Sequence, residues 1–287
     1  MPMTKLQHHY FDLPDVRLHA VRAGDEAGET LMFLHGFPEH WYGWHRQLDF
    51  FAAAGYDVVA PDQRGYNLSS KPKVVKAYTL DKLTGDIVRL ISQLGKEQVV
   101  LVGHDWGGMV AWTLAMHFPH LLRKLVILNI PHPAIMQEHL RKNPKQMLRS
   151  WYAAFFQLPL LPEQAAQAFD FKALSQAMTG TSRPHTFSEE DLAIYKEGWQ
   201  QPNALTSMIN WYRAFRHNPL DLSSTIEVPT LMIWGKEDTA LGAEMAEPSI
   251  AFCPKGRLVF LDEATHWLHH EQPDRVNQEI LTFLRNS

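Results

Sequence analysis

The chain has 287 residues, of which 45% are hydrophobic and 20% charged, and its formal net charge is −4. This composition is ordinary for a globular protein, and the negative charge argues against a dedicated nucleic-acid binder. The single cysteine, Cys253, excludes an internal disulfide bond and suits a reducing compartment. The N-terminal residues lack the apolar core of a signal peptide, and no apolar run approaches the length of a membrane span. We therefore expect a cytoplasmic protein without a membrane partner.

The first half of the chain alternates apolar runs with helical patterns. An alternating pattern predicts an early strand at 16–21. Continuous apolar runs predict buried strands at 30–34, 56–61, 99–102 and 125–130. Between them, Leu80–Leu94 has helical spacing and is followed by Gly95, which suits the end of a helix. Strands that alternate with helices indicate a mostly parallel sheet with helices on both faces, the α/β class.

The pattern changes after Pro133. Residues 134–222 read as helices broken by prolines, and they contain no run typical of a buried strand. Strand patterns then return at 228–235 and 257–261, before an amphipathic helix at 273–284. We expect a core domain of residues 1–133 and 223–287, with a helical cap (lid) at 134–222. The basic segment 140–145 within the cap is interpreted as a solvated face, because the chain is acidic overall.

The most informative stretch is Gly103–Gly108, which reads Gly-His-Asp-Trp-Gly-Gly. It follows an apolar strand and precedes a helical segment, which is the context of a nucleophile elbow. The glycines allow a sharp turn where a Cβ would clash. The usual elbow presents serine, whereas this one presents Asp105. Aspartate is also a good helix N-cap, so the motif alone leaves a purely structural role open.

An aspartate in this position predicts chemistry at saturated carbon. Its carboxylate is ionised at neutral pH and needs no base to become a nucleophile. Attack on an sp³ carbon gives an alkyl ester of the enzyme, and water must then hydrolyse that ester with the help of a general base and an oxyanion hole. The two obvious leaving groups are an epoxide oxygen and a halide. The sequence therefore predicts a two-step hydrolase.

Two further residues complete a candidate triad. Asp238 follows the strand pattern at 228–235, and His266 follows the one at 257–261. Nucleophile, acid and histidine then occur in the chain order of α/β-hydrolases. We expect His266 to accept a proton from the hydrolytic water, and Asp238 to orient its ring and stabilise the imidazolium. Glu237 and Asp262 are the alternative acids, and a local structural role for either triad residue stays open.

The strand at 30–34 ends in His35-Gly36-Phe37. A strand that ends in His-Gly is where an α/β-hydrolase places half of its oxyanion hole. We expect the backbone N–H groups of Phe37 and Trp106 to be the two donors. In isolation the stretch is equally consistent with an ordinary strand-to-helix turn.

Taken together, these residues resemble the α/β-hydrolase fold and, within it, the epoxide hydrolases, over nearly the whole chain. The segments that carry the resemblance are His35–Glu39, Asp62–Tyr66, Gly103–Gly108, Trp234–Asp238 and His266–Trp267. The resemblance implies a mostly parallel central sheet flanked by helices, with an inserted helical cap. It also implies an enzyme that converts a small apolar epoxide and water to a vicinal diol, without a cofactor or a metal.

In that family the cap supplies two tyrosines that donate hydrogen bonds to the epoxide oxygen. By resemblance these are Tyr152, in the segment 150–157, and Tyr212, in Asn210-Trp211-Tyr212-Arg213. The chemistry agrees, because epoxide opening creates a strongly basic alkoxide that a phenol can stabilise or protonate. Simple packing in the cap is the alternative role for both residues. Three other tyrosines are less well placed, namely Tyr42, Tyr66 and Tyr195.

The nearest competing function is a haloalkane or haloacetate dehalogenase with the same Asp105, acid and histidine. Trp106 fits it, because dehalogenases resemble this Asp-Trp-Gly pattern and use the indole N–H to bind the halide. Phe37 fits it less well, because many haloalkane dehalogenases place asparagine there, and fluoroacetate-type enzymes place arginine where this chain has Trp106. A non-catalytic ligand-binding member of the fold is a third possibility. The oligomeric state and the natural substrate are left open.

Overall fold

The computed structural model describes residues 5–286 and contains one central sheet of eight strands. Their order across the sheet is β1-β2-β4-β3-β5-β6-β7-β8, and β2 pairs in antiparallel fashion with both β1 and β4, whereas the other pairs are parallel. The strands are β1 (Gln7–Asp12), β2 (Arg17–Gly24), β3 (Thr30–Leu34), β4 (Asp57–Pro61), β5 (Val99–His104), β6 (Leu122–Leu128), β7 (Thr230–Gly235) and β8 (Gly256–Leu261). This is the mostly parallel α/β architecture that the sequence predicts.

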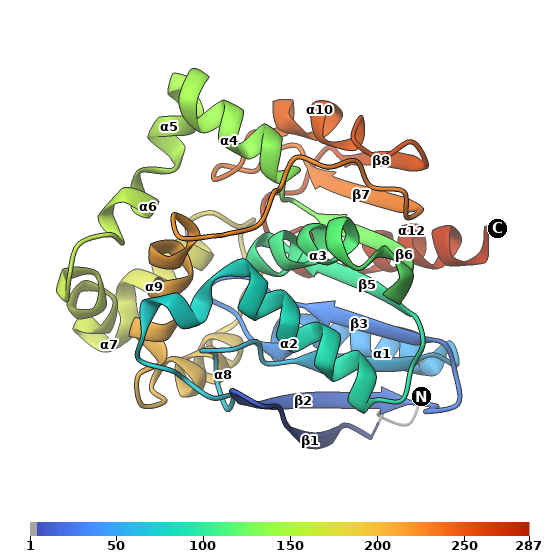
Figure 1. Cartoon of the computed structure of the whole chain (residues 1–287). Helices are drawn as coiled ribbons and strands as arrows, with labels where there is room; N and C mark the ends of the chain where they lie inside the picture. Colours follow the sequence, from blue (N-terminus) through green and yellow to red (C-terminus); the bar gives the residue numbers. More distant parts are fainter. Residues whose placement is uncertain (1–4, 287) are drawn as a thin grey trace.

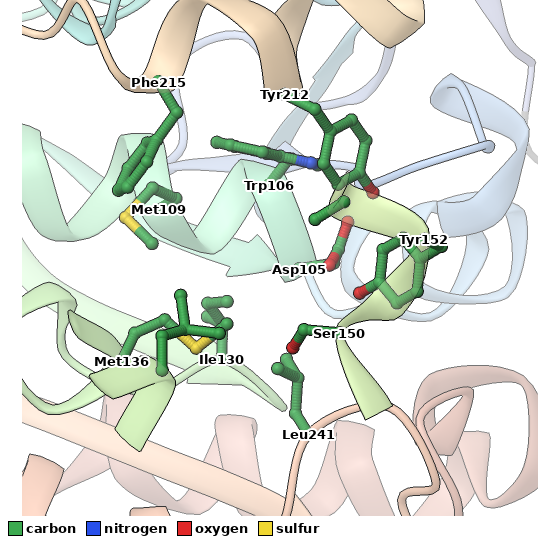
Figure 2. A pocket seen from close by; sticks show the side chains of 12 residues that line it. Asp105, Trp106, Met109, Ile130, Met136, Ser150, Tyr152, Tyr212, Phe215 and Leu241 are labelled. Carbon is green, nitrogen blue, oxygen red and sulfur yellow. The ribbon is translucent and has the colours of Figure 1, made fainter. Parts of the chain in front are cut away.

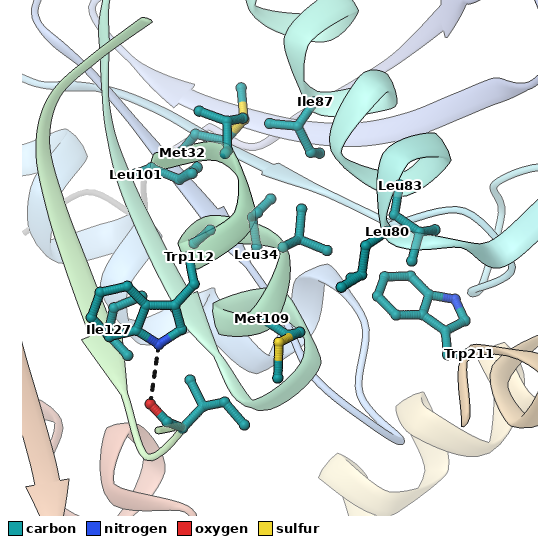
Figure 3. Packing of buried hydrophobic residues seen from close by; sticks show 14 of the residues in the cluster. Met32, Leu34, Leu80, Leu83, Ile87, Leu101, Met109, Trp112, Ile127 and Trp211 are labelled. Atoms are coloured by element: carbon teal, nitrogen blue, oxygen red, sulfur yellow. Dashed lines mark hydrogen bonds between the residues drawn. The ribbon is translucent and has the colours of Figure 1, made fainter. Parts of the chain in front are cut away.

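Helices cover both faces of this sheet (Figure 1). Those of the first half are α1 (His45–Ala53), α2 (Leu80–Gln93) and α3 (Asp105–His117), and those of the C-terminal part are α10 (Ala246–Ile250), α11 (Leu268–Glu271) and α12 (Pro273–Arg285). Buried side chains form one hydrophobic cluster on each side of the sheet. Figure 3 shows part of the cluster around α3, where the buried Trp112 indole donates a hydrogen bond to the carbonyl of Ile130 (3.3 Å).

Between β6 and β7 the chain leaves the sheet and forms a helical insertion. Its helices are α4 (Pro133–Lys142), α5 (Pro144–Arg149), α6 (Trp151–Phe155), α7 (Leu161–Thr179), α8 (Glu189–Trp199) and α9 (Ala204–Phe215). Figure 1 shows most of this insertion beyond the end of the sheet toward which β3 and β7 point. In open α/β sheets, ligands bind outside the carboxyl ends of the strands, so the insertion lies where it can cover such a site.

No helix among the described residues is long and apolar enough to cross a membrane. Two elements of the first half had no counterpart in the sequence prediction, namely β1 and α1. β1 has a polar sequence and lies at the edge of the sheet, where only one neighbour pairs with it. An edge strand of this kind lacks the apolar run by which a buried strand is recognised.

The sheet should tolerate cavities poorly at its centre. Leu101, on β5 between β3 and β6, has no exposed surface. We expect Leu101→Ala to lower the free energy of unfolding by about 2–5 kcal/mol, because the removed methyl groups lose their burial and leave a cavity. Denaturant unfolding measures the loss. Val74→Ala, at a side chain that is 66% exposed, is the control and should change the free energy by less than about 0.5 kcal/mol. Equal stability of Leu101→Ala and the native chain would contradict the packing.

Candidate active site

Asp105 lies at the sharp turn where β5 ends and is the first residue of α3. Its backbone φ of +49° lies in the left-handed region, which residues other than glycine rarely adopt. The turn depends on close approach of the backbone, because a Cβ on Gly107 would lie 2.2 Å from the carbonyl oxygen of Leu34. A Cβ on Gly36 would lie 2.4 Å from the Cβ of Asp105 itself. The glycines therefore bring the ends of β3 and β5 together at one carboxylate.

The two oxygens of that carboxylate have different neighbours. The backbone N–H of Phe37, beyond the end of β3, donates a hydrogen bond to Asp105 Oδ1 (2.9 Å). The other oxygen, Oδ2, lies 3.7 Å from His266 Nε2. Phe37 is thus placed as a donor, and its peptide bond to Pro38 is cis. Within residues 5–286 the backbone N–H of Trp106 has no hydrogen bond to Asp105, so its oxyanion role stays a prediction.

Asp238 contacts the ring nitrogen of His266 that faces away from Asp105. The Nδ1 of His266 and the Oδ2 of Asp238 are 2.7 Å apart, and both residues are buried. The other Asp238 oxygen accepts the backbone N–H groups of Ala240 and Leu241, at 2.7 and 2.8 Å. A carboxylate that is fixed in this way orients the imidazole ring so that Nε2 faces Asp105.

The alternative acids are engaged elsewhere. Glu237 forms an ion pair with Arg183 (2.8 Å), and Asp262 pairs with Lys236 (2.5 Å). Their carboxylates are 49% and 78% exposed, respectively. Among the three acids that the sequence nominated, Asp238 is the one in contact with His266.

Asn129 is a site residue that the sequence analysis missed. It follows β6, is fully buried, and has a φ of +43°. Its amide donates to Asp238 Oδ2 (2.6 Å), while its carbonyl oxygen accepts the N–H of Gly235 (2.8 Å). Asn129 therefore ties the end of β6 to the end of β7 and fixes the oxygen that faces His266. Its only sequence signal is its place at the end of a buried strand, which is shared with many loop residues.

The electrostatics of the pair follow from this geometry. Burial by itself lowers the pKa of His266, but the charge and hydrogen bond of Asp238, and the charge of Asp105, outweigh burial and raise that pKa to about 9. Burial raises the pKa of Asp238, whereas the charge and hydrogen bond of His266 lower it, and the net shift is downward. This raised pKa favours the imidazolium form of His266 at neutral pH, and Asp238 makes the largest contribution to it among the charged neighbours.

Two phenols face Asp105 from the insertion. The hydroxyl groups of Tyr152, on α6, and Tyr212, on α9, both point toward the Asp105 carboxylate in Figure 2. Their rings are 5.9 Å apart, and Tyr212 also packs edge-on against Trp106 (5.0 Å) and Phe37 (5.4 Å). Burial, followed by the charge of Asp105, raises the pKa of both phenols, so that they stay protonated and can donate hydrogen bonds.

A cavity of about 120 Å³ joins these groups. It lies between the core and the insertion and is mostly apolar. Its lining consists of Asp105, Trp106, Met109, Ile130 and Leu241 from the core, and of Met136, Leu140, Ser150, Tyr152, Ala153, Tyr212 and Phe215 from the insertion. A concave apolar site with a few convergent polar groups is the usual form of a small-molecule site.

The three tyrosines judged less well placed have other partners or positions. Tyr42 donates to Asp191 (2.8 Å), and Tyr195 donates to the buried Glu39 (2.8 Å). Tyr66 is buried against His35, with ring centres 4.6 Å apart. None of the three lines the cavity beside Asp105.

A buried cluster of histidines around Glu39 lies behind His266, and the sequence analysis did not find it. His104 Nε2 donates to the carbonyl of His266 (2.8 Å), while His104 Nδ1 is 3.5 Å from Glu39. Glu39, His269 and His270 have ligand atoms within 4.8 Å of one another, which is close enough to hold a metal ion. Glu39 Oε1 accepts hydrogen bonds from His270 Nε2 (2.7 Å) and from the hydroxyl of Tyr195, whereas Glu39 Oε2 and both ring nitrogens of His269 have no hydrogen-bond partner among residues 5–286.

The chain is similar to known proteins over nearly its whole length. Residues 29–273 match the family model described as the alpha/beta hydrolase fold. The chain is 48% identical to the AB hydrolase superfamily protein YfhM of Bacillus subtilis, over 99% of this chain and 100% of that protein. It is 40% identical to mouse epoxide hydrolase 4, over 97% of this chain and 79% of that protein. The crystal structure of Bacillus megaterium epoxide hydrolase with an inhibitor superposes with a TM-score of 0.88 at 30% identity, and covers 97% of this chain and 100% of that one.

The charge of Asp105 should be measurable at His266. Because that charge helps to raise the pKa of His266 to about 9, we expect Asp105→Asn to lower this pKa. An NMR titration of isotope-labelled histidine measures it, with His266→Gln used to assign the signal. Asp262→Asn removes an exposed carboxylate that pairs with Lys236 and should leave the pKa unchanged. An Asp105→Asn variant with an unaltered His266 titration would show that the two groups do not interact.

Proposed function

The chain belongs to the α/β-hydrolase fold family, in the group that includes the epoxide hydrolases, and on this premise we propose that it hydrolyses epoxides to vicinal diols. The reaction would proceed through a covalent alkyl ester on Asp105, which water activated by His266 and Asp238 then hydrolyses. Tyr152 and Tyr212 would donate to the epoxide oxygen, and the N–H groups of Phe37 and Trp106 would form the oxyanion hole. Residues 134–222 would act as the cap domain over a core of 1–133 and 223–287.

The observation that carries this proposal is the pair of phenols aimed at the Asp105 carboxylate in an apolar cavity. Opening an epoxide leaves an alkoxide on the carbon next to the one attacked. A protonated phenol can stabilise or neutralise that charge, and the raised pKa values of Tyr152 and Tyr212 favour the protonated form. The electrophile would bind between the phenols and the carboxylate, with its oxygen on the phenols and a ring carbon facing Asp105.

The two carboxylate oxygens of Asp105 have different roles in the first step. Because Oδ1 is held by the Phe37 N–H, Oδ2 is the oxygen left to attack the ring carbon. A new C–O bond forms from Oδ2 while the ring C–O bond breaks, and the proton comes from a tyrosine. Oδ1 becomes the carbonyl oxygen of the ester, so Phe37 already donates to the atom that carries negative charge in the second step.

The second step needs His266 as a base. In the free enzyme the charge of Asp105 favours the imidazolium. Esterification removes that charge, so the pKa of His266 falls when a base is needed. The imidazolium then gives up its proton, which replaces the one that the tyrosine gave to the substrate. The neutral imidazole takes a proton from water as the water oxygen attacks the ester carbonyl, and Asp238 stabilises the imidazolium that forms. The bond between the Asp105 carbonyl carbon and the substrate oxygen breaks, the hydroxyl proton of the tetrahedral intermediate passes to that oxygen, and the diol leaves Asp105 as a carboxylate. Asn129 would keep the Asp238 oxygen in line with the ring.

A dehalogenase is the second candidate function, because the indole ring of Trp106 lines the cavity beside Asp105. Halide ions are weak bases and need only N–H donors. Dehalogenation would give the two phenols no catalytic role, and for this reason we favour epoxide hydrolysis as the function. The apolar lining suits small apolar substrates, with water as the second reactant and no cofactor.

The two functions are separated by parallel turnover assays of the native protein and Tyr212→Phe. We expect diol release from a panel of aromatic and aliphatic epoxides, and no halide release from matched haloalkanes and haloacids. In Tyr212→Phe, kcat for epoxides should fall about 10- to 100-fold, because one acid catalyst is lost.

The matched control for that assay is Tyr78→Phe. Tyr78 is buried, but its hydroxyl donates to the carbonyl of Pro72 and it does not line the cavity, so diol release should persist. Halide release without diol would assign the chain to the dehalogenases and leave Tyr212 as a packing residue. Absence of both products would reject hydrolysis at saturated carbon for these substrates.

The covalent intermediate is tested with His266→Gln. This variant keeps the nucleophile but lacks the base, so the ester should accumulate. We expect intact-mass spectrometry to detect an adduct of the mass of an epoxide that the native protein turns over, and peptide mapping to place it on Asp105. The double variant Asp105→Asn, His266→Gln should carry no adduct. If the single variant carries none either, the two-step scheme is wrong.

A further inference from the structure

Exposed apolar side chains gather on the outer edge of the helical insertion, residues 141–161. Among the described residues, ten large hydrophobic side chains are exposed, and six of them lie within this edge. The most exposed are Leu148 (74%), Leu160 (70%) and Trp151 (64%), and the other three are Met147, Leu158 and Leu161. They come from α5, α6, the loop that follows and the first residue of α7, and Figure 1 shows α6 below α5 and α7 below α6 on the left of the molecule.

Cations accompany these apolar groups. Residues 133–162 contain four basic side chains, Arg141, Lys142, Lys145 and Arg149, but only one acidic side chain, Glu138. Glu138 pairs with Lys142 (2.9 Å). The other three cations have no ion pair with any carboxylate in residues 5–286. The outer edge is therefore positive, although the chain as a whole has a net charge of −4.

The inner side of the same segment lines the cavity. Ser150, Tyr152 and Ala153 line it, whereas Trp151 between them is turned to solvent. The outer apolar groups are thus not needed to close the cavity. Together with the cations they give α5 and α6 a composition that is typical of segments lying on a membrane surface, where tryptophan and leucine enter the interface and basic side chains bind anionic headgroups.

We propose that the outer edge, residues 141–161, binds the surface of a bilayer that contains anionic phospholipid. The sequence alone favoured a solvated face for the basic segment and no membrane partner, and the exposed apolar groups beside it change that interpretation. No described helix can span a membrane, so the contact is peripheral. A second copy of the chain fits less well, because a twofold interface would bring the unpaired cations of one copy against those of the other.

The test uses the purified full chain and flotation with two kinds of vesicle, phosphatidylcholine alone and phosphatidylcholine with phosphatidylglycerol. We expect binding to the second kind that weakens at high salt. A charge variant, Arg141→Gln with Lys145→Gln and Arg149→Gln, should weaken binding about fivefold per charge removed. An apolar variant, Leu148→Ser with Trp151→Ser and Leu160→Ser, should also lose binding.

The matched control removes three exposed lysines from the core, Lys73→Gln with Lys76→Gln and Lys255→Gln, and should bind like the native chain. Circular dichroism verifies the fold of each variant. Equal binding to both kinds of vesicle, or edge variants that bind like the control, would overturn the proposal. So would a dimer, detected by light scattering, that the apolar variant abolishes. The readout is independent of epoxide turnover, so this proposal can fail or stand without regard to the proposed activity.

Discussion

The site depends on the contact of one carboxylate with two different neighbours. Asp105 Oδ1 accepts the N–H of Phe37, and Oδ2 faces His266 Nε2 at 3.7 Å. These neighbours come from the ends of β3 and β8, on either side of β5, β6 and β7 in the sheet. The contact requires strands that are parallel and in register, because only then do their carboxyl ends meet at one edge. The left-handed backbone of Asp105 and the glycines around it allow the final approach.

The competition between burial and charge decides the state of His266. Burial alone would favour the neutral ring, but two carboxylates near it reverse that preference and raise its pKa to about 9. The carboxylate of Asp238 is fixed in place, because the amide of Asn129 and two backbone N–H groups donate hydrogen bonds to it. The other, Asp105, would be neutralised on forming an ester. Under the proposed mechanism, Asp105 is therefore the nucleophile and also one of the charges that raise the pKa of the histidine.

The helical insertion has two faces with different chemistry. Its inner face offers the phenols of Tyr152 and Tyr212 to the cavity. Its outer edge exposes leucine and tryptophan beside cations that have no ion pair within residues 5–286. On α6 these roles fall to successive residues, Trp151 outward and Tyr152 inward. If both proposals hold, a substrate dissolved in a membrane would meet the protein at the helices that also line its cavity.

The amino-acid pattern alone predicted the α/β class, a helical segment between the strand patterns at 125–130 and 228–235, and the three triad candidates. These features are local, since apolar runs of strand length and a Gly-X-Asp-X-Gly turn can be read within a few residues. The predicted strands agree with the observed ones within a few residues at each end, for example 30–34 with β3 and 257–261 with β8. The edge strand β1 was not predicted, because its polar sequence contains no such apolar run.

Which side chains are in contact could be known only from the folded chain. Asn129 meets Asp238 across 109 positions of the chain, and His104 meets the backbone of His266 across 162. The folded chain also places Asp238, rather than Glu237 or Asp262, against His266, and it directs both tyrosines of the helical insertion toward Asp105. Periodicity and motifs indicate which backbone conformation a short segment prefers. The partner of a side chain depends instead on how distant strands are ordered in the sheet, and that order is set by packing of the whole chain.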